Sequence, residues 1–215
     1  MRSWERAKLR KAALRYVDHG WHVLPGAYLL GQRAGRHAKE RRFDCGEVGC
    51  RTVACHPVPS CARTPSRSPA VVAQWWSRNP HTVLFPTGHA FDVLEVSATL
   101  GRAALLGDGF VAARGPVAVA QQKGQGDRWF FLVLPGHGLL PELAQQPDVV
   151  LHGQGSWVPA APSPQFGGRV RWELSPETHD WRPAEPYAVQ ALMLDAIGAG
   201  PLATAGPRAT WRSAA

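Results

Sequence analysis

Four cysteines and a histidine are concentrated in one short stretch of this 215-residue chain. Their positions are Cys45, Cys50, Cys55, His56 and Cys61. Zinc prefers four sulfur or nitrogen ligands arranged as a tetrahedron, and a short glycine-containing segment can wrap around such an ion. We expect a structural zinc ion held by Cys45, Cys50 and His56. Cys55 and Cys61 compete for the fourth position.

The spacing of these cysteines leaves two other interpretations open. The thiols are separated by four residues, whereas the strongest zinc signature is a pair of CxxC motifs. They could therefore be unligated loop cysteines, or they could take part in redox or disulfide chemistry. The N-terminal segment is charged and has no apolar leader, so we expect a cytoplasmic protein, where clustered thiols favour metals over disulfides.

The charge balance predicts an anionic partner. Lys and Arg number 24 against 16 Asp and Glu, a formal net charge of +8. Most of the cations are Arg, whose planar fork matches phosphate, although a GC-rich genome also encodes an Arg-rich composition. The 45% hydrophobic content excludes global disorder. No apolar run approaches the roughly 18 residues of a membrane span, so we expect no membrane partner.

The expected elements alternate between helices and short strands. Caps, prolines and apolar spacing predict helices over residues 3–19, 68–79, 98–106 and 187–197. Alternating or β-branched runs predict strands over residues 21–25, 82–85, 91–96, 117–120, 129–134, 149–152, 157–160 and 170–173. Gly153 to Gly155 is predicted to be a hairpin-type link between two of these strands.

This pattern predicts a single α/β domain of the mixed α+β type, with a sheet flanked by helices. The domain spans residues 1–197 and includes a basic and Cys-rich loop over residues 26–68. A disordered tail is expected over residues 198–215.

Six segments follow one another in an order that resembles a known family. They are 13–25, 45–57, 72–80, 91–96, 153–163 and 168–172. Together they are similar to the N-terminal domain of bifunctional DNA primase–polymerases (prim-pol), over roughly residues 10 to 195. The resemblance implies a fold of the archaeo-eukaryotic primase type and an actinobacterial source. It also implies nucleotidyl transfer, which needs carboxylates that hold two divalent metal ions.

The first active-site element of that family is altered in this chain. The family strand that matches Val93 to Ser97 ends in Asp-x-Asp, and alternation puts both carboxylates on one face. Here Glu95 and Ser97 stand at these two catalytic positions. Asp92 has the opposite parity and is expected to point away.

The second element is a glycine-rich turn followed by a Ser/Thr–His pair that contacts the nucleotide phosphates. Here the matching residues, 123–130, contain no histidine. Lys123 and Arg128 could still bind phosphate, or the segment could be a solvated turn. The third element is an acid before the Gly-x-Gly link, and its position is occupied by Val150. Asp148 could replace that acid only after a shift.

Two further arginines could contact nucleic acid. Arg169 and Arg171 flank Trp172 at strand spacing, and an interleaved basic and aromatic face can neutralise and stack a single strand. A tryptophan buried in a core is the other interpretation of Trp172.

Because all three active-site elements are altered, we expect the polymerase chemistry to be lost. The sequence predicts a degenerate prim-pol-like domain that binds nucleic acid or a nucleotide. One alternative is an active primase–polymerase that uses Glu95 with Asp148 or Asp92 and Mg²⁺ or Mn²⁺. That enzyme would need a helicase or another replication partner. The other alternative is a protein-interaction scaffold without nucleic acid.

Overall fold

The computed structural model describes residues 2–31, 41–52, 54–107, 114–122, 124 and 126–198. The chain forms two compact units. The first contains Met1–Pro86 and Trp157–Val170, and the second contains Thr87–Ser156 and Arg171–Ala215. The chain therefore passes from one unit to the other after residues 86, 156 and 170.

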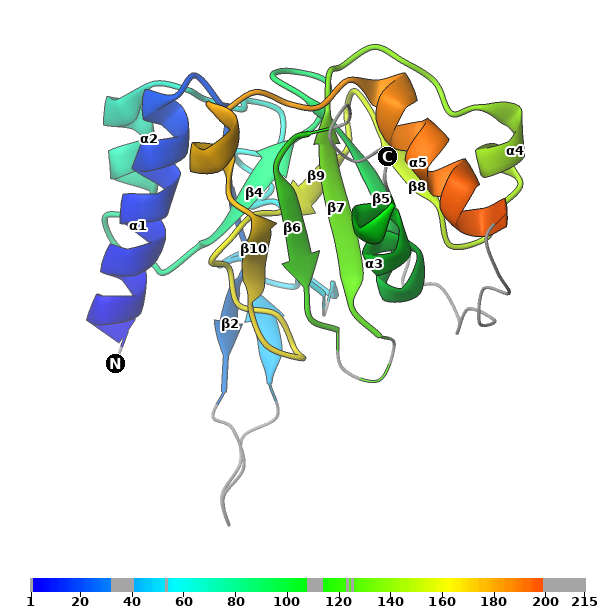
Figure 1. Ribbon diagram of the computed structural model, residues 1–215. Coiled ribbons are helices and arrows are strands. Elements are labelled where there is room, and N and C mark those ends of the chain that lie inside the picture. Colours follow the sequence, from blue (N-terminus) through cyan, green and yellow to red (C-terminus); the bar gives the residue numbers. More distant parts are fainter. Residues whose placement is uncertain are drawn as a thin grey trace. The chain divides into compact units, whose positions relative to one another are not determined.

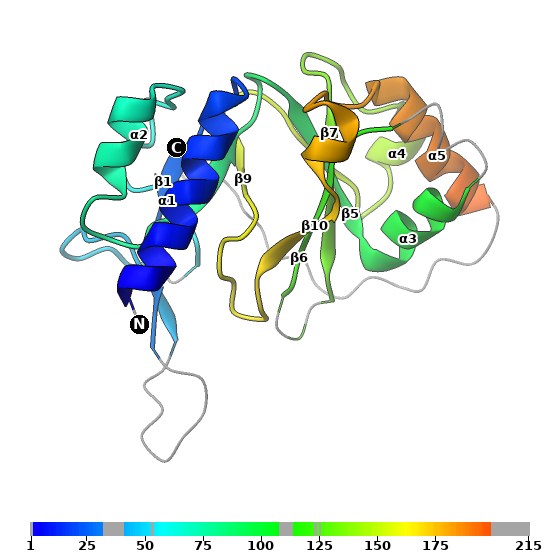
Figure 2. The same cartoon turned by 60° about the vertical axis from the view of Figure 1, so that its left-hand side comes forward.

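The first unit combines helices with a three-stranded antiparallel sheet. The helices are α1 (Arg2–Asp18) and α2 (Pro69–Trp75), which lie side by side in Figure 2. The strand order in the sheet is β1 (Leu24–Gly26), β4 (Thr82–Pro86) and β9 (Trp157–Pro159). A separate antiparallel pair consists of β2 (Tyr28–Leu30) and β3 (Arg42–Asp44). The Cys-rich segment follows directly after β3.

Helix α1 is held against the first unit by one apolar face. Leu9 and Ala13 are fully buried, and Tyr16 and Val17 continue the same face one turn later. The Tyr16 hydroxyl donates a hydrogen bond of 2.5 Å to the carbonyl of Ala161, just after β9. The exposed residues of α1 include Arg10, Lys11, Arg15 and Asp18.

The second unit contains a five-stranded sheet. Its strand order is β10 (Val170–Leu174), β6 (Val117–Ala120), β7 (Arg128–Val133), β5 (Asp92–Ser97) and β8 (Val150–His152). Strand β5 is an internal strand, because it pairs antiparallel with both β7 and β8. The helices of this unit are α3 (Ala98–Leu106), α4 (Pro141–Ala144), α5 (Pro186–Gly198) and the 3₁₀ helix η2 (Pro176–His179). Figure 1 labels the strands of this sheet and the helices α3, α4 and α5.

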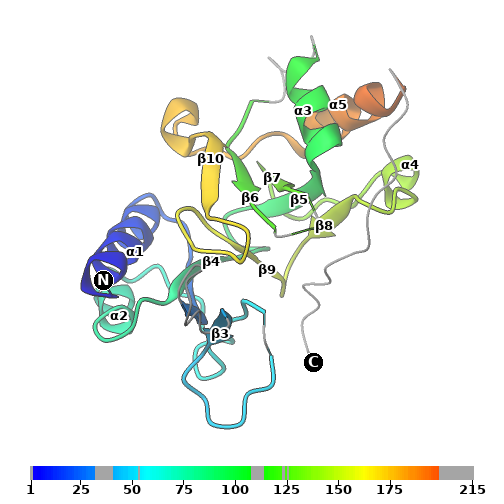
Figure 3. The ribbon, with the colours of Figure 1, turned by 90° about the horizontal axis from the view of Figure 1, so that it is seen from below.

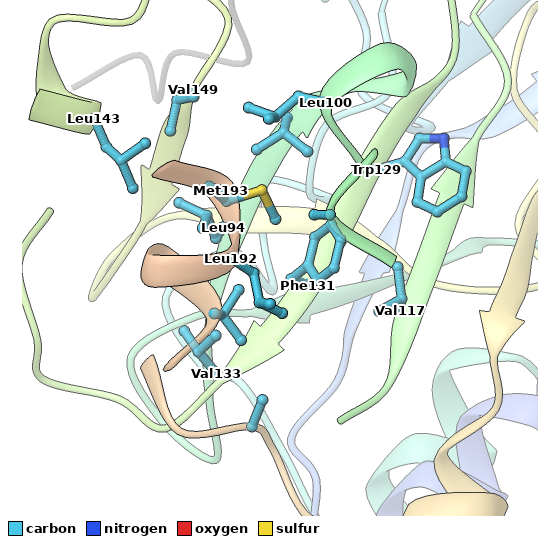
Figure 4. Packing of buried hydrophobic residues seen from close by; sticks show 14 of the residues in the cluster. Leu94, Leu100, Val117, Trp129, Phe131, Val133, Leu143, Val149, Leu192 and Met193 are labelled. Carbon is cyan, nitrogen blue, oxygen red and sulfur yellow. The ribbon is translucent and has the colours of Figure 1, made fainter. Parts of the chain in front are cut away.

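One face of the five-stranded sheet is covered by α3 and α5, as Figure 3 shows. The apolar core lies between this face and the helices (Figure 4). Its main contributors are Leu94, Val96, Leu100, Trp129, Phe131, Leu192 and Met193. Strand residues alternate between faces, so the residues between these, such as Glu95 and Ser97, belong to the opposite face of the sheet.

The predicted mixed α+β class is confirmed, and the helices over residues 3–19, 98–106 and 187–197 are found with ends shifted by at most one residue. The helix expected over residues 68–79 is shorter and ends at Trp75. The strand pair formed by residues 117–120 and 129–134 is present as β6 and β7.

The predicted hairpin around Gly153 to Gly155 is wrong. Strand β8 pairs with β5 in the second unit, whereas β9 pairs with β4 in the first. The segment from Gly153 to Gly155 therefore connects the two units, although its glycines are typical of a hairpin turn. Sequence analysis also missed the three-residue strands β2 and β3 within residues 26–68.

Several predicted features lie outside the described residues. They are residues 32–40 of the predicted basic and Cys-rich loop, Lys123 and, after Gly198, the expected disordered tail. Within the described residues, no helix combines the length and apolar character needed to cross a membrane.

Candidate functional site

The predicted catalytic position Glu95 lies in the middle of β5, on the sheet face opposite α3 and α5. It is buried, and each oxygen of its carboxylate has a cationic or potentially cationic partner. The Arg128 Nε donates to Oε1 at 2.6 Å, and the His152 Nε2 lies 2.7 Å from Oε2. Glu95, Arg128 and His152 come from the neighbouring strands β5, β7 and β8. We call these three residues the Glu95 cluster.

The two partners are themselves fixed by further hydrogen bonds. A second guanidinium nitrogen of Arg128 donates to the backbone carbonyl of Asp148 at 2.8 Å. The Nδ1 of His152 lies 3.0 Å from the hydroxyl oxygen of Ser156. The side chains of Glu95 and His152 are 6% and 7% exposed, so water has little access to their contact. The cluster is therefore a connected polar network in the interior of the second unit.

The pKa of Glu95 shows which effect dominates in this network. Burial by itself raises the pKa of a carboxyl group, because it penalises the charged form. The hydrogen bond and charge of His152, together with the charge and hydrogen bond of Arg128, outweigh that penalty and place the pKa of Glu95 below its usual value. Glu95 is thus an ionised carboxylate at neutral pH.

Ser97 ends β5 and begins α3. Its hydroxyl oxygen accepts a hydrogen bond from the backbone N–H of Leu100 at 3.4 Å, so it is the N-cap of the helix. Gly101 lets the same helix pack closely on β7, since a Cβ at that position would lie 2.7 Å from the Trp129 ring. In this structure Ser97 therefore acts as a helix cap.

Val150, the residue at the position expected for the third acid, lies directly opposite Glu95 in the β5–β8 register. Asp148 lies two residues earlier, before β8 begins, and contributes its carbonyl to Arg128. Asp92 belongs to the core-side face, where its Oδ2 accepts a hydrogen bond from the backbone N–H of Gly136 at 2.9 Å. The structure brings neither carboxylate into the Glu95 cluster.

The three predicted phosphate-binding arginines all have acidic partners within the chain. Arg128 contacts Glu95, as described above. Arg169 makes a bidentate contact with Glu5, with nitrogen–oxygen distances of 2.7 and 2.8 Å. Arg171 forms an exposed ion pair with Glu173. A phosphate group would have to compete with a carboxylate at each of these arginines.

His152 is the residue that sequence analysis missed. No local motif surrounds this histidine. Alternation along the strand puts His152 on the same face as Val150, and the structure places Val150 opposite Glu95. Recognising it required the β5–β8 register, which no nearby turn specifies.

The Cys-rich segment brings together three of its five predicted ligands. The ligand atoms of Cys45, Cys50 and His56 all lie within 4.8 Å of one another, so this group could hold a metal ion. Cys55 is excluded from the group because it is completely buried and its sulfur contacts the Thr82 hydroxyl at 3.3 Å. Burial raises the pKa of the Cys55 thiol to about 12. Cys61 also lies outside the group.

A comparison with family models identifies the evolutionary origin of this arrangement. The model of the bifunctional DNA primase/polymerase N-terminal family, Prim-Pol, matches residues 13–187. The chain is a member of the Prim-Pol family. No curated protein matches the chain in a sequence search.

Membership confirms the expected family and a primase/polymerase-like nucleotidyltransferase fold. The Prim-Pol match includes all of β5, β7 and β8, and therefore the whole Glu95 cluster. It also includes the group formed by Cys45, Cys50 and His56. Both candidate sites thus belong to the Prim-Pol domain itself.

Proposed function

We propose that this chain is a catalytically degenerate Prim-Pol domain that binds nucleic acid or a nucleotide without transferring nucleotides. One observation carries the proposal: both carboxylate oxygens of Glu95 are engaged by side chains of the same chain, Arg128 and His152. A guanidinium and an imidazole ring supply the partners that divalent cations would supply in an active enzyme.

The donor set around Glu95 does not fit two divalent cations. Mg²⁺ and Mn²⁺ are hard cations that prefer oxygen ligands, and a two-metal site needs several carboxylates. Around Glu95 the neighbouring positions hold the capping hydroxyl of Ser97 and the apolar side chain of Val150. The positive charge of Arg128 further opposes a cation at the remaining carboxylate. We therefore assign no catalytic step to this site.

Extension of a primed and an unprimed template with Mg²⁺ or Mn²⁺ and nucleoside triphosphates tests the loss of catalysis. We expect no product from the wild-type chain. Product that disappears in Glu95→Ala but persists in Glu142→Ala, an exposed acid outside the cluster, would overturn the proposal. That result would identify an active enzyme with a reduced metal site.

The binding half of the proposal rests on the charge of the chain and on helix α1. The net charge is +8, and the exposed face of α1 carries Arg10 and Lys11. In the described part of the chain, no ion pair engages either residue. Trp4, 66% exposed, and Lys8 above its ring extend the same helix surface toward the N-terminus. Cations and an exposed aromatic ring suit the phosphates and bases of a single strand.

Binding to single-stranded DNA and RNA, measured by fluorescence anisotropy across a salt series, tests this half. Because binding releases condensed counterions, we expect the logarithm of the affinity to fall linearly with the logarithm of the salt concentration. Absence of binding to single strands and to nucleoside triphosphates at low salt would contradict the proposal. It would favour a protein-interaction scaffold instead.

Zinc is the cofactor that belongs to this proposal, as a structural ion at Cys45, Cys50 and His56. Two thiolates and an imidazole are ligands that favour zinc over Mg²⁺ or Mn²⁺. The four cysteines are all unpaired. This state suits the reducing cytoplasm, where we place the protein.

A further inference from the structure

Two of the three ligand atoms of the Cys45, Cys50 and His56 group have the separation found in a tetrahedral metal site. The sulfur of Cys50 lies 3.5 Å from the Nε2 of His56. Zinc–sulfur bonds of about 2.3 Å and zinc–nitrogen bonds of about 2.0 Å, set at tetrahedral angles, require ligand atoms about 3.5 to 3.8 Å apart. The observed separation therefore leaves room for one ion without rearrangement of these two side chains.

A second contact fixes the histidine in the form that a metal needs. The Nδ1 of His56 lies 2.8 Å from the backbone carbonyl oxygen of Ala54. A carbonyl oxygen only accepts hydrogen bonds, so Nδ1 carries a proton, and in the neutral ring Nε2 then keeps its lone pair. That lone pair belongs to the nitrogen near Cys50. Ligating histidines in metal sites are oriented by such a contact on the other ring nitrogen.

The backbone between the two cysteines is shaped by glycines and an Asp turn. Gly46 and Gly49 have positive φ angles of 84° and 82°, a conformation that other residues rarely adopt. The Oδ1 of Asp44 accepts a hydrogen bond from the Gly46 N–H at 2.7 Å. These turns bring Cys45 and Cys50 to the same side of the segment.

We infer that this group is a three-ligand zinc centre, since no fourth His, Cys, Asp or Glu of the described residues joins it, and that its fourth coordination position is open to solvent or to an external ligand. The three protein ligands are the Cys45 sulfur, the Cys50 sulfur and the His56 Nε2. Cys55 is held away by burial and by Thr82, and Cys61 lies outside the group. Cys50 is exposed, so the site is accessible from solvent. The inference deepens the zinc assignment made above and is independent of nucleic-acid binding.

An open position has a chemical consequence. A structural zinc site closed by four protein ligands excludes further ligands, whereas a site with three protein ligands binds water or a small donor in the fourth place. The expected external ligands are small nitrogen or sulfur donors such as imidazole, azide or a thiolate.

Cobalt substitution tests the inference without any enzymatic readout. The full-length chain, reduced and freed of metal, is titrated with Co²⁺ and followed by visible absorption. We expect one Co²⁺ per chain, thiolate-to-cobalt charge-transfer bands and displacement of the cobalt by Zn²⁺. Addition of azide or imidazole is expected to shift the ligand-field bands, because these donors enter the open position. Single-strand binding is measured separately, so failure of the two proposals can be told apart.

Matched cysteine variants identify the ligands. Cys50→Ser and His56→Ala are expected to weaken Co²⁺ binding at least tenfold, whereas Cys61→Ser is expected to change it less than twofold. Circular dichroism of each metal-free variant checks that the fold is retained. The inference is overturned if the folded, reduced chain shows no thiolate-to-cobalt band. It is equally overturned if azide leaves the spectrum unchanged and Cys61→Ser weakens binding as strongly as Cys50→Ser.

Discussion

At the scale of single residues, the main feature of this protein is the buried carboxylate of Glu95, whose two partners are side chains of the same chain. Glu95 stands where the Prim-Pol resemblance places one of the metal-binding acids, yet its partners are Arg128 and His152. A buried charge is tolerated only when it is paired and hydrogen-bonded. The contacts with Arg128 and His152 therefore explain how an acid is retained in the interior when its companion carboxylates are absent.

Removing Arg128 is expected to destabilise the protein markedly. In Arg128→Ala the buried carboxylate loses one of its two partners, which costs about 3 kcal/mol, the lower end of the usual range, because His152 remains. Arg171→Ala is the matched control, since its ion pair with Glu173 is exposed and is worth less than about 1 kcal/mol. Urea unfolding measures both. Equal losses of unfolding free energy in the two variants would show that the buried contact of Arg128 stabilises the fold no more than an exposed ion pair does.

The lowered pKa of Glu95 predicts an acid-dependent contribution to stability. A carboxyl group that ionises more readily in the folded state stabilises the fold above its unfolded pKa, here 4.5. That contribution is lost as the pH falls below about 4.5 toward the folded pKa. The wild type is therefore expected to exceed Glu95→Gln in unfolding free energy at pH 7, and the difference is expected to shrink on acidification. Denaturant unfolding from pH 7 to pH 3 measures it, and a constant difference would contradict the assignment.

At the scale of elements, the site is created by strand register. Strand β5 is paired on both sides, so Glu95 has neighbours from β7 and β8 at the same level of the sheet. A shift of β8 by one residue would exchange its faces and remove His152 from Glu95. The register thus decides whether residues 95 and 150 face one another.

Restoring carboxylates at these register positions is expected to restore cation binding. In the triple variant Ser97→Asp, Arg128→Ala, Val150→Asp, three acids share one sheet face, because residue 150 lies directly opposite Glu95 at a Cβ separation of about 5 Å. Electron paramagnetic resonance is expected to show bound Mn²⁺ in this variant and none in the wild type.

A matched control uses the same substitutions with Leu151→Asp in place of Val150→Asp. Leu151 pairs with Leu94, so its side chain belongs to the other face of the sheet. Mn²⁺ binding of equal strength in both variants would show that the register does not build the site.

At the scale of the whole molecule, ion pairs within the chain neutralise part of the positive charge that the composition indicates. The arginines that sequence analysis selected in the described part of the chain are neutralised by Glu95, Glu5 and Glu173. Among the residues that the structure describes, no carboxylate forms an ion pair with Arg10 or Lys11 on the exposed face of α1. We therefore expect nucleic acid to contact α1 more strongly than the strands that carry those arginines.

Charge reversal on α1 is expected to weaken single-strand binding and to reduce its salt dependence. Each lost phosphate contact lowers the slope by about 0.7 for a single strand, so Arg10→Glu with Lys11→Glu should lower it by about 1.4. Arg63→Glu with Arg67→Glu, both exposed, changes the net charge equally and is the matched control. Anisotropy titrations at several salt concentrations measure the slopes. Equal effects of the two pairs would indicate a response to net charge alone.

The sequence by itself determined the features that depend on neighbours along the chain. Apolar spacing and caps predicted α1, α3 and α5, and alternation predicted that Glu95 and Ser97 share a face and that Asp92 does not. The spacing of Cys45, Cys50 and His56 predicted a group of ligands, because all three lie within one short segment. These features are local, so propensity and periodicity are sufficient to specify them.

Only the tertiary structure decided which distant residues meet. His152 reaches Glu95 because β5 and β8 pair. The next strand along the chain, β9, pairs with β4 instead of β8. The ion pairs of Arg128 with Glu95 and of Arg169 with Glu5 join residues 33 and 164 positions apart. Strand pairing and ion pairs over such separations are selected by the total burial and charge balance of the folded chain, and no local pattern records them.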